Sequence, residues 1–200
     1  MNEQDVYDAI VTRRSTRNYK PTPVEPEKLA RIIDAGRYAP SGGNSQTNRF
    51  FVVQKQEIIA DLIKLVEEAF SKMDVYDGMY RSLRNSILRS KEGGYLFCYN
   101  APVLVVVANK KDYGNNMADC AVAIENMMVE ANAFDLGSCW INQLRWLKDN
   151  PVIMEYLYEL GLHEEEAVFG SLSLGYADSE DGLPNRRMVP IKGNEVTYIG

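Results

Sequence analysis

Hydrophobic residues follow two spacings along the chain, one typical of helices and the other of strands. Apolar residues three or four positions apart predict helices over residues 2–12, 26–39, 58–69, 119–133 and 151–161. Apolar runs predict buried strands at 50–53 and 102–108, and the second run, rich in β-branched residues, suits the middle of a sheet. Shorter patterns predict extended segments at 137–141 and 168–176 and a last edge strand at 196–199. Residues 73–94 are polar and predict only a weak helix or a mobile excursion.

The predicted helix over residues 119–133 is apolar on almost every side. A single domain of 200 residues has little material with which to surround such a helix, because a surface helix normally buries only one face. The pattern therefore indicates a central helix that lies at a dimer interface. Neither an internal repeat nor a linker interrupts the chain, so we expect a single domain over residues 1–200.

Composition and charge narrow the class of protein. Hydrophobic residues make up 46% and charged residues 25% of the chain, values typical of a packed globular fold. The formal net charge of −6 disfavours a protein that binds long nucleic acid. Three cysteines without a CxxC pair indicate neither a disulfide framework nor a thiolate metal site, which favours the reducing cytoplasm. The polar start does not resemble a signal peptide and no apolar run could span a bilayer, so we expect no membrane partner.

Several enzyme classes lack their usual residues in this chain. His163 is the only histidine and lies beside three glutamates, where a solvated loop residue is a simpler interpretation than a catalytic base. Gly170, Ser173 and Gly175 have the spacing GxxSxG within an alternating strand, which differs from the nucleophile elbow GxSxG. Neither a close histidine and cysteine set nor a P-loop or GxGxxG motif is present. We therefore expect no metal and assign no catalytic acid or base.

A basic cluster near the start of the chain contrasts with the acidic protein. Arg13, Arg14, Arg17 and Lys20 place four cations within eight residues without an acid. One interpretation is that Arg13 and Arg14 complement the negative end of the first helix dipole, an effect worth about 0.3–1 kcal/mol. The other is a phosphate site, because guanidinium groups bind phosphate oxygens bidentately and Ser15 can add a hydroxyl donor.

A second basic pair follows a long acidic stretch near the end of the chain. Residues 149–185 contain nine acids and no Lys or Arg, and Arg186 and Arg187 end this stretch abruptly. If the N-terminal cluster holds a phosphate, this pair would close the same site from the far end of the chain.

Two further segments contain small or polar residues. Residues 39–46, Ala-Pro-Ser-Gly-Gly-Asn-Ser-Gln, suit an ordinary helix-to-strand turn, or a surface on which a flat polar ring lies close to the backbone. Residues 137–143, Gly-Ser-Cys-Trp-Ile-Asn-Gln, suit simple core packing of Trp140 and Ile141. Neither segment by itself identifies a site.

Taken together, these features resemble the FMN-dependent nitroreductase family, in the family's order and over nearly the whole chain. The matching segments are Arg13–Arg17 followed by Tyr19, residues 39–46 before the strand at 50–53, Asn100–Pro102 before the central strand, residues 137–141, and residues 171–176 followed by Arg186 and Arg187. Each segment is common by itself, but the ordered set is specific. The resemblance implies an α+β fold, a nitroreductase-like sandwich with a central mixed, largely antiparallel β-sheet flanked by helices, built as an intertwined homodimer.

The resemblance also implies an FMN site at the dimer interface. The arginines and serine of the first segment and the C-terminal basic pair would hold the FMN phosphate, which implicates Arg13, Arg14, Ser15, Arg17, Arg186 and Arg187. The loop at 39–46 would pack near the flavin ring from the partner protomer, which implicates Pro40, Ser41, Gly42, Asn44 and Gln46. The third segment would lie against the other side of the ring, which implicates Cys139, Trp140, Ile141 and Asn142.

The activity that the resemblance implies is that of an NAD(P)H-dependent flavin oxidoreductase. Such a protein takes hydride from NADH or NADPH onto FMN and passes electrons to a nitroaromatic, quinone or similar small-molecule acceptor by ping-pong kinetics. Thr47 and Asn48 replace a Pro-Trp pair of many relatives, and residues 93–95 offer no amide or lysine for the pyrimidine edge of the flavin. Two alternatives stay open, an FMN-binding or flavin-sensing protein without turnover and a non-redox module for another phosphorylated metabolite.

Overall fold

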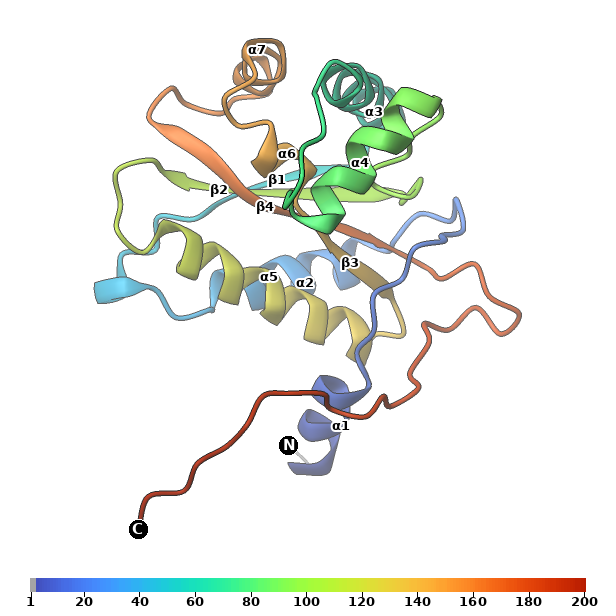
Figure 1. The fold of residues 1–200 in the computed structure, drawn as a ribbon. Coiled ribbons are helices and arrows are strands. Elements are labelled where there is room, and N and C mark those ends of the chain that lie inside the picture. Colours follow the sequence, from blue (N-terminus) through green and yellow to red (C-terminus); the bar gives the residue numbers. More distant parts are fainter. Residues whose placement is uncertain (1–2) are drawn as a thin grey trace.

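The computed structural model describes residues 3–200, and its centre is an antiparallel β-sheet (Figure 1). In sheet order the strands are β1 (Arg49–Val53), β2 (Val103–Lys110), β4 (Glu166–Gly175) and β3 (Gly137–Ile141). Strand β2 is buried over all but its last residue, which confirms the predicted central strand. The sheet was expected to be mixed, but within residues 3–200 the one parallel pairing is an isolated bridge between Ser15 and Ser138.

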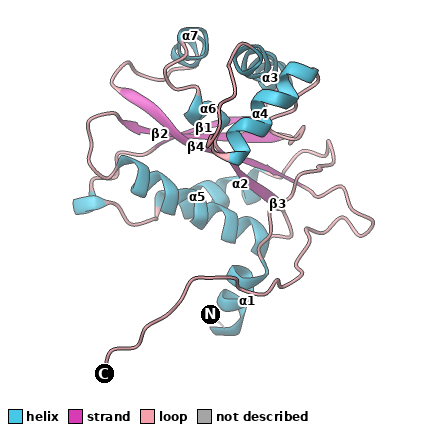
Figure 2. Cartoon of the chain, viewed as in Figure 1, coloured by secondary structure: helices cyan, strands magenta, loops and turns pink. Residues whose placement is uncertain are grey.

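Four helices cover one face of the sheet (Figure 2). They are α3 (Gln56–Ser71), α4 (Arg81–Glu92), α6 (Gln143–Trp146) and α7 (Pro151–Glu159). Helix α4 replaces the weak helix or mobile excursion expected over residues 73–94. Its buried positions are Ser86, Ile87 and Ser90, so two of the three carry a hydroxyl and the buried face has no clear apolar pattern.

The other face of the sheet is covered by α5 (Asn116–Ala133), with α2 (Pro26–Arg37) packed outside it. Gly36 of α2 allows this close packing, because a Cβ atom there would lie 2.8 Å from Cγ of Met127. Helix α5 thus buries most of its apolar surface within the chain, although Val122 on its outer side is 38% exposed. The central position predicted for this helix is confirmed, while its place at an interface stays a prediction.

Both ends of the chain carry apolar residues that the rest of the chain leaves exposed. Helix α1 (Glu3–Thr12) packs on α5 but exposes Val6, Tyr7 and Ile10. The tail after β4 returns past α1 and then extends away from the body (Figure 1). The edge strand predicted at 196–199 is wrong, because these residues form no strand and Ile199 is 94% exposed. A strand needs a neighbouring strand for its hydrogen bonds, and within residues 3–200 none lies beside this segment.

Candidate functional site

The basic segment that follows α1 is fixed along the free edge of β3. The backbone N–H of Thr16 donates to the carbonyl of Ser138 at 2.9 Å, next to the Ser15–Ser138 bridge. The Thr16 side chain packs on Gly137, where a Cβ atom would lie 2.6 Å from Oγ1 of Thr16. The buried Tyr19 then ties the segment to β4, because its hydroxyl donates to the carbonyl of Thr16 at 2.8 Å and lies 3.3 Å from that of Ser173. The segment is therefore a rigid border of the sheet.

Three of the predicted phosphate ligands lie around the buried thiol of Cys139. Burial raises the pKa of Cys139, while the charge of Arg17, a hydrogen bond from Ser15 and the charge of Arg13 act in the opposite direction. The pKa of Arg17 is also raised: burial lowers it, but the thiol of Cys139 and the hydroxyl of Tyr99 together outweigh that effect. Arg13, Ser15 and Arg17 thus lie near one another around Cys139 of β3, while their role as phosphate ligands stays a prediction.

Arg13 has a donor that the chain itself does not satisfy. Its Nε atom is buried and has no hydrogen-bond partner among the described residues, although the carboxylate of Glu125 lies 3.4 Å away. An unpaired buried donor costs about 1–3 kcal/mol, so native proteins rarely leave one without a reason. The site therefore suits an added acceptor group such as a phosphate oxygen.

Arg14 and Arg187 bring the two ends of the chain together. Nε of Arg14 donates to the carbonyl of Arg187 at 2.8 Å, and its Nη atoms donate to the carbonyls of Val11, at 3.0 Å, and of Arg13. Arg14 therefore closes the end of α1, as the helix-dipole interpretation proposed, and holds the tail against the basic segment. The side chain of Arg187 is exposed beside this contact.

Arg186 turns away from the basic segment. Its guanidinium donates to Oδ1 of Asn132 at 3.3 Å, to the carbonyl of Asn132 and to the carboxylate of Asp135 at 2.6 Å. These acceptors lie at the C-terminal end of α5, where a cation is favoured by the helix dipole. The structure thus gives this guanidinium its own set of partners at the end of α5, beside Asn132, which also binds Ala9 and Thr12 of α1.

The segment at 137–142 is divided between the two faces of the sheet. Cys139 and Ile141 face the core beneath α3, α4 and α6, whereas Trp140 faces α5, because successive residues of a strand point to opposite sides. Trp140 Nε1 donates to Oδ1 of Asn142 at 3.0 Å, which fixes the indole over Gly170. The four residues therefore do not form one surface, although the Trp140 and Asn142 side chains are hydrogen-bonded to each other.

The glycine-rich loop is held against the start of α5. Its residues 42–44 form the short helix η1 (Gly42–Asn44). The backbone N–H of Gly42 lies 3.2 Å from both carboxylate oxygens of the buried Asp119, and the hydroxyl of Tyr113 lies within 3.0 Å of the Gly42 carbonyl and of Asp119. The N–H of Gln46 donates to Oγ of Ser41 at 3.0 Å. Pro40, Asn44 and Gln46 stay exposed, so the loop is an ordered surface.

Within one chain, this loop does not meet the basic segment. The loop is anchored at Asp119, while α1 and Arg186 are anchored at Asn132, near the other end of α5. Thirteen residues of helix at a rise of 1.5 Å separate the two anchors by about 20 Å. Figure 1 shows η1 and the segment after α1 at different ends of this helix. The predicted set therefore forms two half-sites.

A cavity that the sequence did not predict lies beside the basic segment. It has a volume of about 420 Å³, and its walls include Arg17, Arg89, Tyr95 and Tyr99. The polar stretch at 73–94 gave no helical register, so the direction of Arg89 could not be inferred from the sequence. The run of cations in this segment, which has no apolar pattern, is the sequence feature that could have pointed to the cavity.

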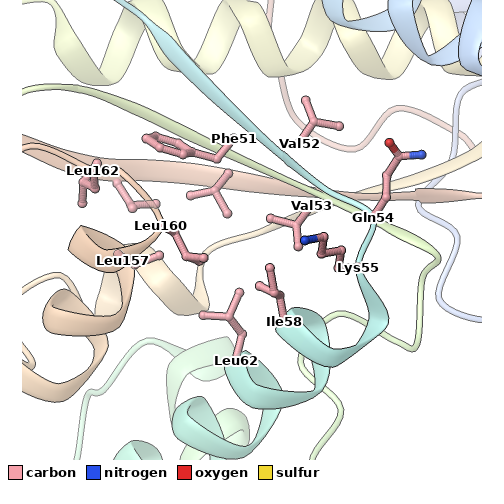
Figure 3. Close-up of a pocket in the computed structure, with 12 residues that line it drawn as sticks. Phe51, Val52, Val53, Gln54, Lys55, Ile58, Leu62, Leu157, Leu160 and Leu162 are labelled. Carbon is pink, nitrogen blue, oxygen red and sulfur yellow. The ribbon is translucent and has the colours of Figure 1, made fainter.

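A second cavity, of about 390 Å³, lies between β1, α3 and α7 (Figure 3). Its walls are aliphatic and aromatic, and Lys55 is the one charged side chain that lines it. Figure 3 shows Phe51, Ile58 and Leu162 directed toward the same space. This cavity lacks the array of donors that the basic segment offers.

The residues that the structure describes were also searched for metal ligands, for a hydrolase-type histidine or serine, and for membrane-spanning helices. No group of three His, Cys, Asp or Glu residues between residues 3 and 200 could hold a metal ion. His163 is exposed in a loop, 3.4 Å from the carboxylate of Glu165, and Ser173 lies within β4, as expected from the sequence. Among the described helices, none has the length and apolar character that crossing a bilayer requires.

Comparison with known proteins decides the family. The Nitroreductase family matches residues 10–176, which include the basic segment, the glycine-rich loop and β3. The chain belongs to the nitroreductase family. The structure of a nitroreductase with bound FMN from Bacteroides fragilis is 35% identical, with a TM-score of 0.85 over 100% of each chain.

Two relatives of this nitroreductase are similar in sequence along most of their length. A protein of Archaeoglobus fulgidus named as an NADH dehydrogenase/NAD(P)H nitroreductase is 28% identical over 86% of this chain and 84% of its own. A 4-nitrobenzoate reductase of Pseudomonas putida is 25% identical over 92% of this chain and 91% of its own. The similarity therefore extends over most of each protein and is not confined to one motif.

Proposed function

We propose that this nitroreductase is an FMN-dependent enzyme that transfers electrons from NAD(P)H to a nitroaromatic, quinone or similar acceptor by a ping-pong mechanism. The observation that carries the proposal is the clustering of Arg13, Ser15 and Arg17 beside Cys139 at the edge of β3, where the buried Nε of Arg13 makes no hydrogen bond and has only the ion pair with Glu125 at 3.4 Å. The FMN-bound relative at 35% identity supports the same cofactor here.

We assign the phosphate of FMN to Arg13, Ser15 and Arg17, with Arg187 added from the tail. Nε of Arg13 supports this assignment, because it is 3.4 Å from Glu125 but makes no hydrogen bond, and a phosphate oxygen would supply one. Arg14 is a positioning residue, since its guanidinium holds the backbone of Val11, Arg13 and Arg187 in place. We place Arg186 in the same role, because it binds the end of α5.

We place the flavin ring between the β3–α6 junction of one chain and the loop at 40–46 of a second copy. When bound, FMN accepts hydride from NAD(P)H and supplies the electrons that the acceptor receives. The chain supplies position, shielding from water and hydrogen-bond donors. Trp140, held by its hydrogen bond to Asn142, would form a flat apolar wall beside the ring. The ordered backbone of residues 42–46 would let the polar ring lie close to it. No histidine or metal is required by this division of roles.

We propose a homodimer as the working form. The 20 Å that separates the half-sites supports this arrangement, because one chain alone cannot enclose the ring. The exposed apolar residues of α1 and of the tail add support, among them Ile10 at 51%, Ile191 at 81% and Ile199 at 94% exposed. Large apolar side chains left exposed in this way are often covered by a second protein chain.

We place the enzyme in the cytoplasm. Its three cysteines are all buried and unpaired, which suits a reducing compartment. Burial raises the pKa of Cys98 and Cys120 to about 12, so neither thiol is a ready nucleophile for disulfide formation.

The absorption spectrum of the purified protein tests the proposed function. We expect bound FMN to give a yellow protein, and anaerobic NADH or NADPH to bleach it in the absence of an acceptor. Added nitroaromatic or quinone should then restore the colour. A colourless protein that takes up no FMN contradicts the proposal, and FMN binding without reduction by either dinucleotide identifies a flavin-binding protein without turnover.

A further inference from the structure

The aliphatic cavity between β1, α3 and α7 lies apart from both half-sites (Figure 3). Strand β1 is one edge of the sheet, and β3, which borders the basic segment, is the other edge. The cavity also lies on the face of the sheet opposite α5, the helix that holds the glycine-rich loop. None of the residues that line it belongs to the proposed cofactor site.

The walls of this cavity are apolar down to the sheet. Three of the lining residues are at most 1% exposed and form its inner end: Leu62, Val106 and Val168. A buried water molecule needs about three hydrogen-bond partners, and these side chains offer none. Protein interiors leave few voids larger than a water molecule, whereas this cavity measures about 390 Å³, within the range of small-molecule sites. The space therefore suits an aliphatic body better than a cluster of waters.

The aromatic wall of the cavity is held in place by the chain itself. The guanidinium of Arg49 lies over the ring of Phe51, with its Cζ atom 4.9 Å from the ring centroid. Arg49 is in turn paired at 2.6 Å with the carboxylate of Glu166, which is buried. These contacts fix the ring before any ligand binds, and a preformed wall lowers the entropic cost of binding.

Lys55 places an unpaired cation at the rim of the cavity. It is the one charged side chain among the lining residues, and Figure 3 shows it directed toward the apolar space, whereas the amide of Gln54 points away. No carboxylate between residues 3 and 200 lies within 4.0 Å of its ammonium. Lys55 is also the N-cap of α3, where a cation meets the positive end of the helix dipole, and its side chain makes no capping bond. A residue that breaks a local rule in this way is typical of a functional position.

We propose that this cavity binds a medium-chain fatty acid or a similar aliphatic monocarboxylate, with its chain among the apolar walls and its carboxylate beside Lys55. A lysine is a point charge that demands no fixed geometry from its partner, which suits a carboxylate. One ammonium balances one negative charge, so a dianionic phosphate would stay partly uncompensated here. The inference goes beyond the proposed function and does not depend on it, because its test requires neither FMN nor turnover.

Calorimetry with straight-chain carboxylates tests the apolar part of the proposal. The purified full-length protein is titrated with hexanoate, octanoate, decanoate and dodecanoate. Each added methylene should tighten binding about fourfold until the chain fills the cavity, after which the affinity should level off. Absence of binding, or an affinity that rises without a limit, contradicts the proposal, because adsorption to exposed apolar surface has no such length limit.

Variants of Lys55 test the charged part of the proposal. The probes are decanoate, decanol and decylamine, and the wild type should bind decanoate most tightly. K55Q should raise the Kd of decanoate about threefold to fivefold and leave that of decanol unchanged, because an exposed ion pair is partly screened by solvent. K55E should prefer decylamine to decanoate. K64Q removes an exposed lysine of the same helix outside the cavity and is the matched control. Equal effects of K55Q and K64Q overturn the proposal.

A cavity-filling variant shows where the chain of the ligand lies. Leu160 is a half-buried lining residue, and the larger side chain of L160W should occupy the space and abolish the rise in Tm that decanoate gives the wild type. Binding that survives in folded L160W places the ligand elsewhere and overturns the proposal. Release of bound FMN by decanoate would also overturn it, because the carboxylate would then lie at the basic segment. The Lys55 variants change only an exposed side chain and decide the question if L160W does not fold.

Discussion

At the scale of single residues, the site depends on which guanidinium groups the chain itself already uses. Arg14 and Arg186 bind backbone carbonyls and Arg186 also binds Asp135, whereas the buried Nε of Arg13 is ion-paired with Glu125 at 3.4 Å and makes no hydrogen bond. Arginines of the two basic segments thus have different tasks in the fold. A sequence motif cannot show which arginines are already bound, because their partners belong to α5 and to the tail.

Replacing Arg13 should weaken FMN binding without unfolding the protein. R13Q removes charged hydrogen bonds worth about 1.5–3 kcal/mol, which corresponds to roughly a tenfold to hundredfold rise in the Kd of FMN. Fluorescence titration with FMN measures the change. R31Q is the control, because Arg31 is also paired with a single glutamate but has a side chain that is 69% exposed. Equal affinities for the wild type and R13Q would contradict the assignment of the phosphate.

The buried thiols make the stability of the protein depend on alkaline pH. Burial raises the pKa of Cys98 and Cys120 to about 12, from a usual value of 9.0, so the folded protein keeps protons that the unfolded chain releases. The free energy of unfolding should therefore be unaffected below pH 8 and fall as pH rises from about 9 toward 12, by at most about 1.4 kcal/mol per thiol and pH unit.

Urea unfolding at pH 7, 9 and 10 measures this dependence. The double variant C98A/C120A should lose stability less steeply above pH 9 than the wild type, because it lacks the two thiols. Some decline should remain, because other groups such as the buried Tyr19 titrate in both proteins. Identical slopes for the two proteins would show that the thiols do not cause the decline.

At the scale of elements, α5 positions both half-sites. Its first turn supplies Asp119, which binds the glycine-rich loop, and its last turn supplies Asn132, which binds the carbonyl of Ala9 at 2.9 Å and the side chain of Arg186. The sheet and α2 hold this helix from two sides. A disturbance at one end of α5 therefore reaches one half-site and leaves the other in place.

Removing the carboxylate of Asp119 should release the loop. D119A leaves the N–H of Gly42 and the hydroxyl of Tyr113 without this partner, and we expect a loss of about 1–3 kcal/mol in unfolding free energy. Hydrogen exchange should rise at residues 41–46 and stay unchanged at residues 13–17. D112N, in the exposed turn before α5, is the control. Unchanged exchange at the loop in D119A would contradict this role.

The sequence predicted most elements, because their apolar residues have helical or strand spacing. Strand β2 and helix α5 were found in this way. Helix α4 was predicted only as a weak helix or a mobile excursion, because serines occupy two of its three buried positions. Residues 196–199 were predicted as a strand from their composition, although the described residues place no strand beside them. The basic segment was found from charge alone. The contacts of Arg186 and the position of Arg89 beside a cavity could not be predicted, because both depend on how the helices pack rather than on the local sequence pattern.

At the scale of the whole molecule, one chain carries two halves of a site at different ends of a helix. The apolar residues of α1 and the tail are exposed, and the part of the tail after Arg187 extends away from the body of its own chain (Figure 1). A second copy would meet both needs, since it would cover this surface and bring its loop to the basic segment. The central claim is therefore that each flavin site takes its phosphate ligands from one chain and its loop from the other.

Complementation between two inactive variants tests this claim most directly. R13Q damages the phosphate half-site, and G42A damages the loop, because a Cβ atom at Gly42 would lie 2.0 Å from Nδ2 of Asn115. The two variants are co-expressed with different tags, and FMN is measured in the purified mixed dimer. We expect one intact site per mixed dimer, with about half the FMN of the wild type, while each variant alone holds little. A mixed dimer as empty as its parents would show that each site lies within a single chain.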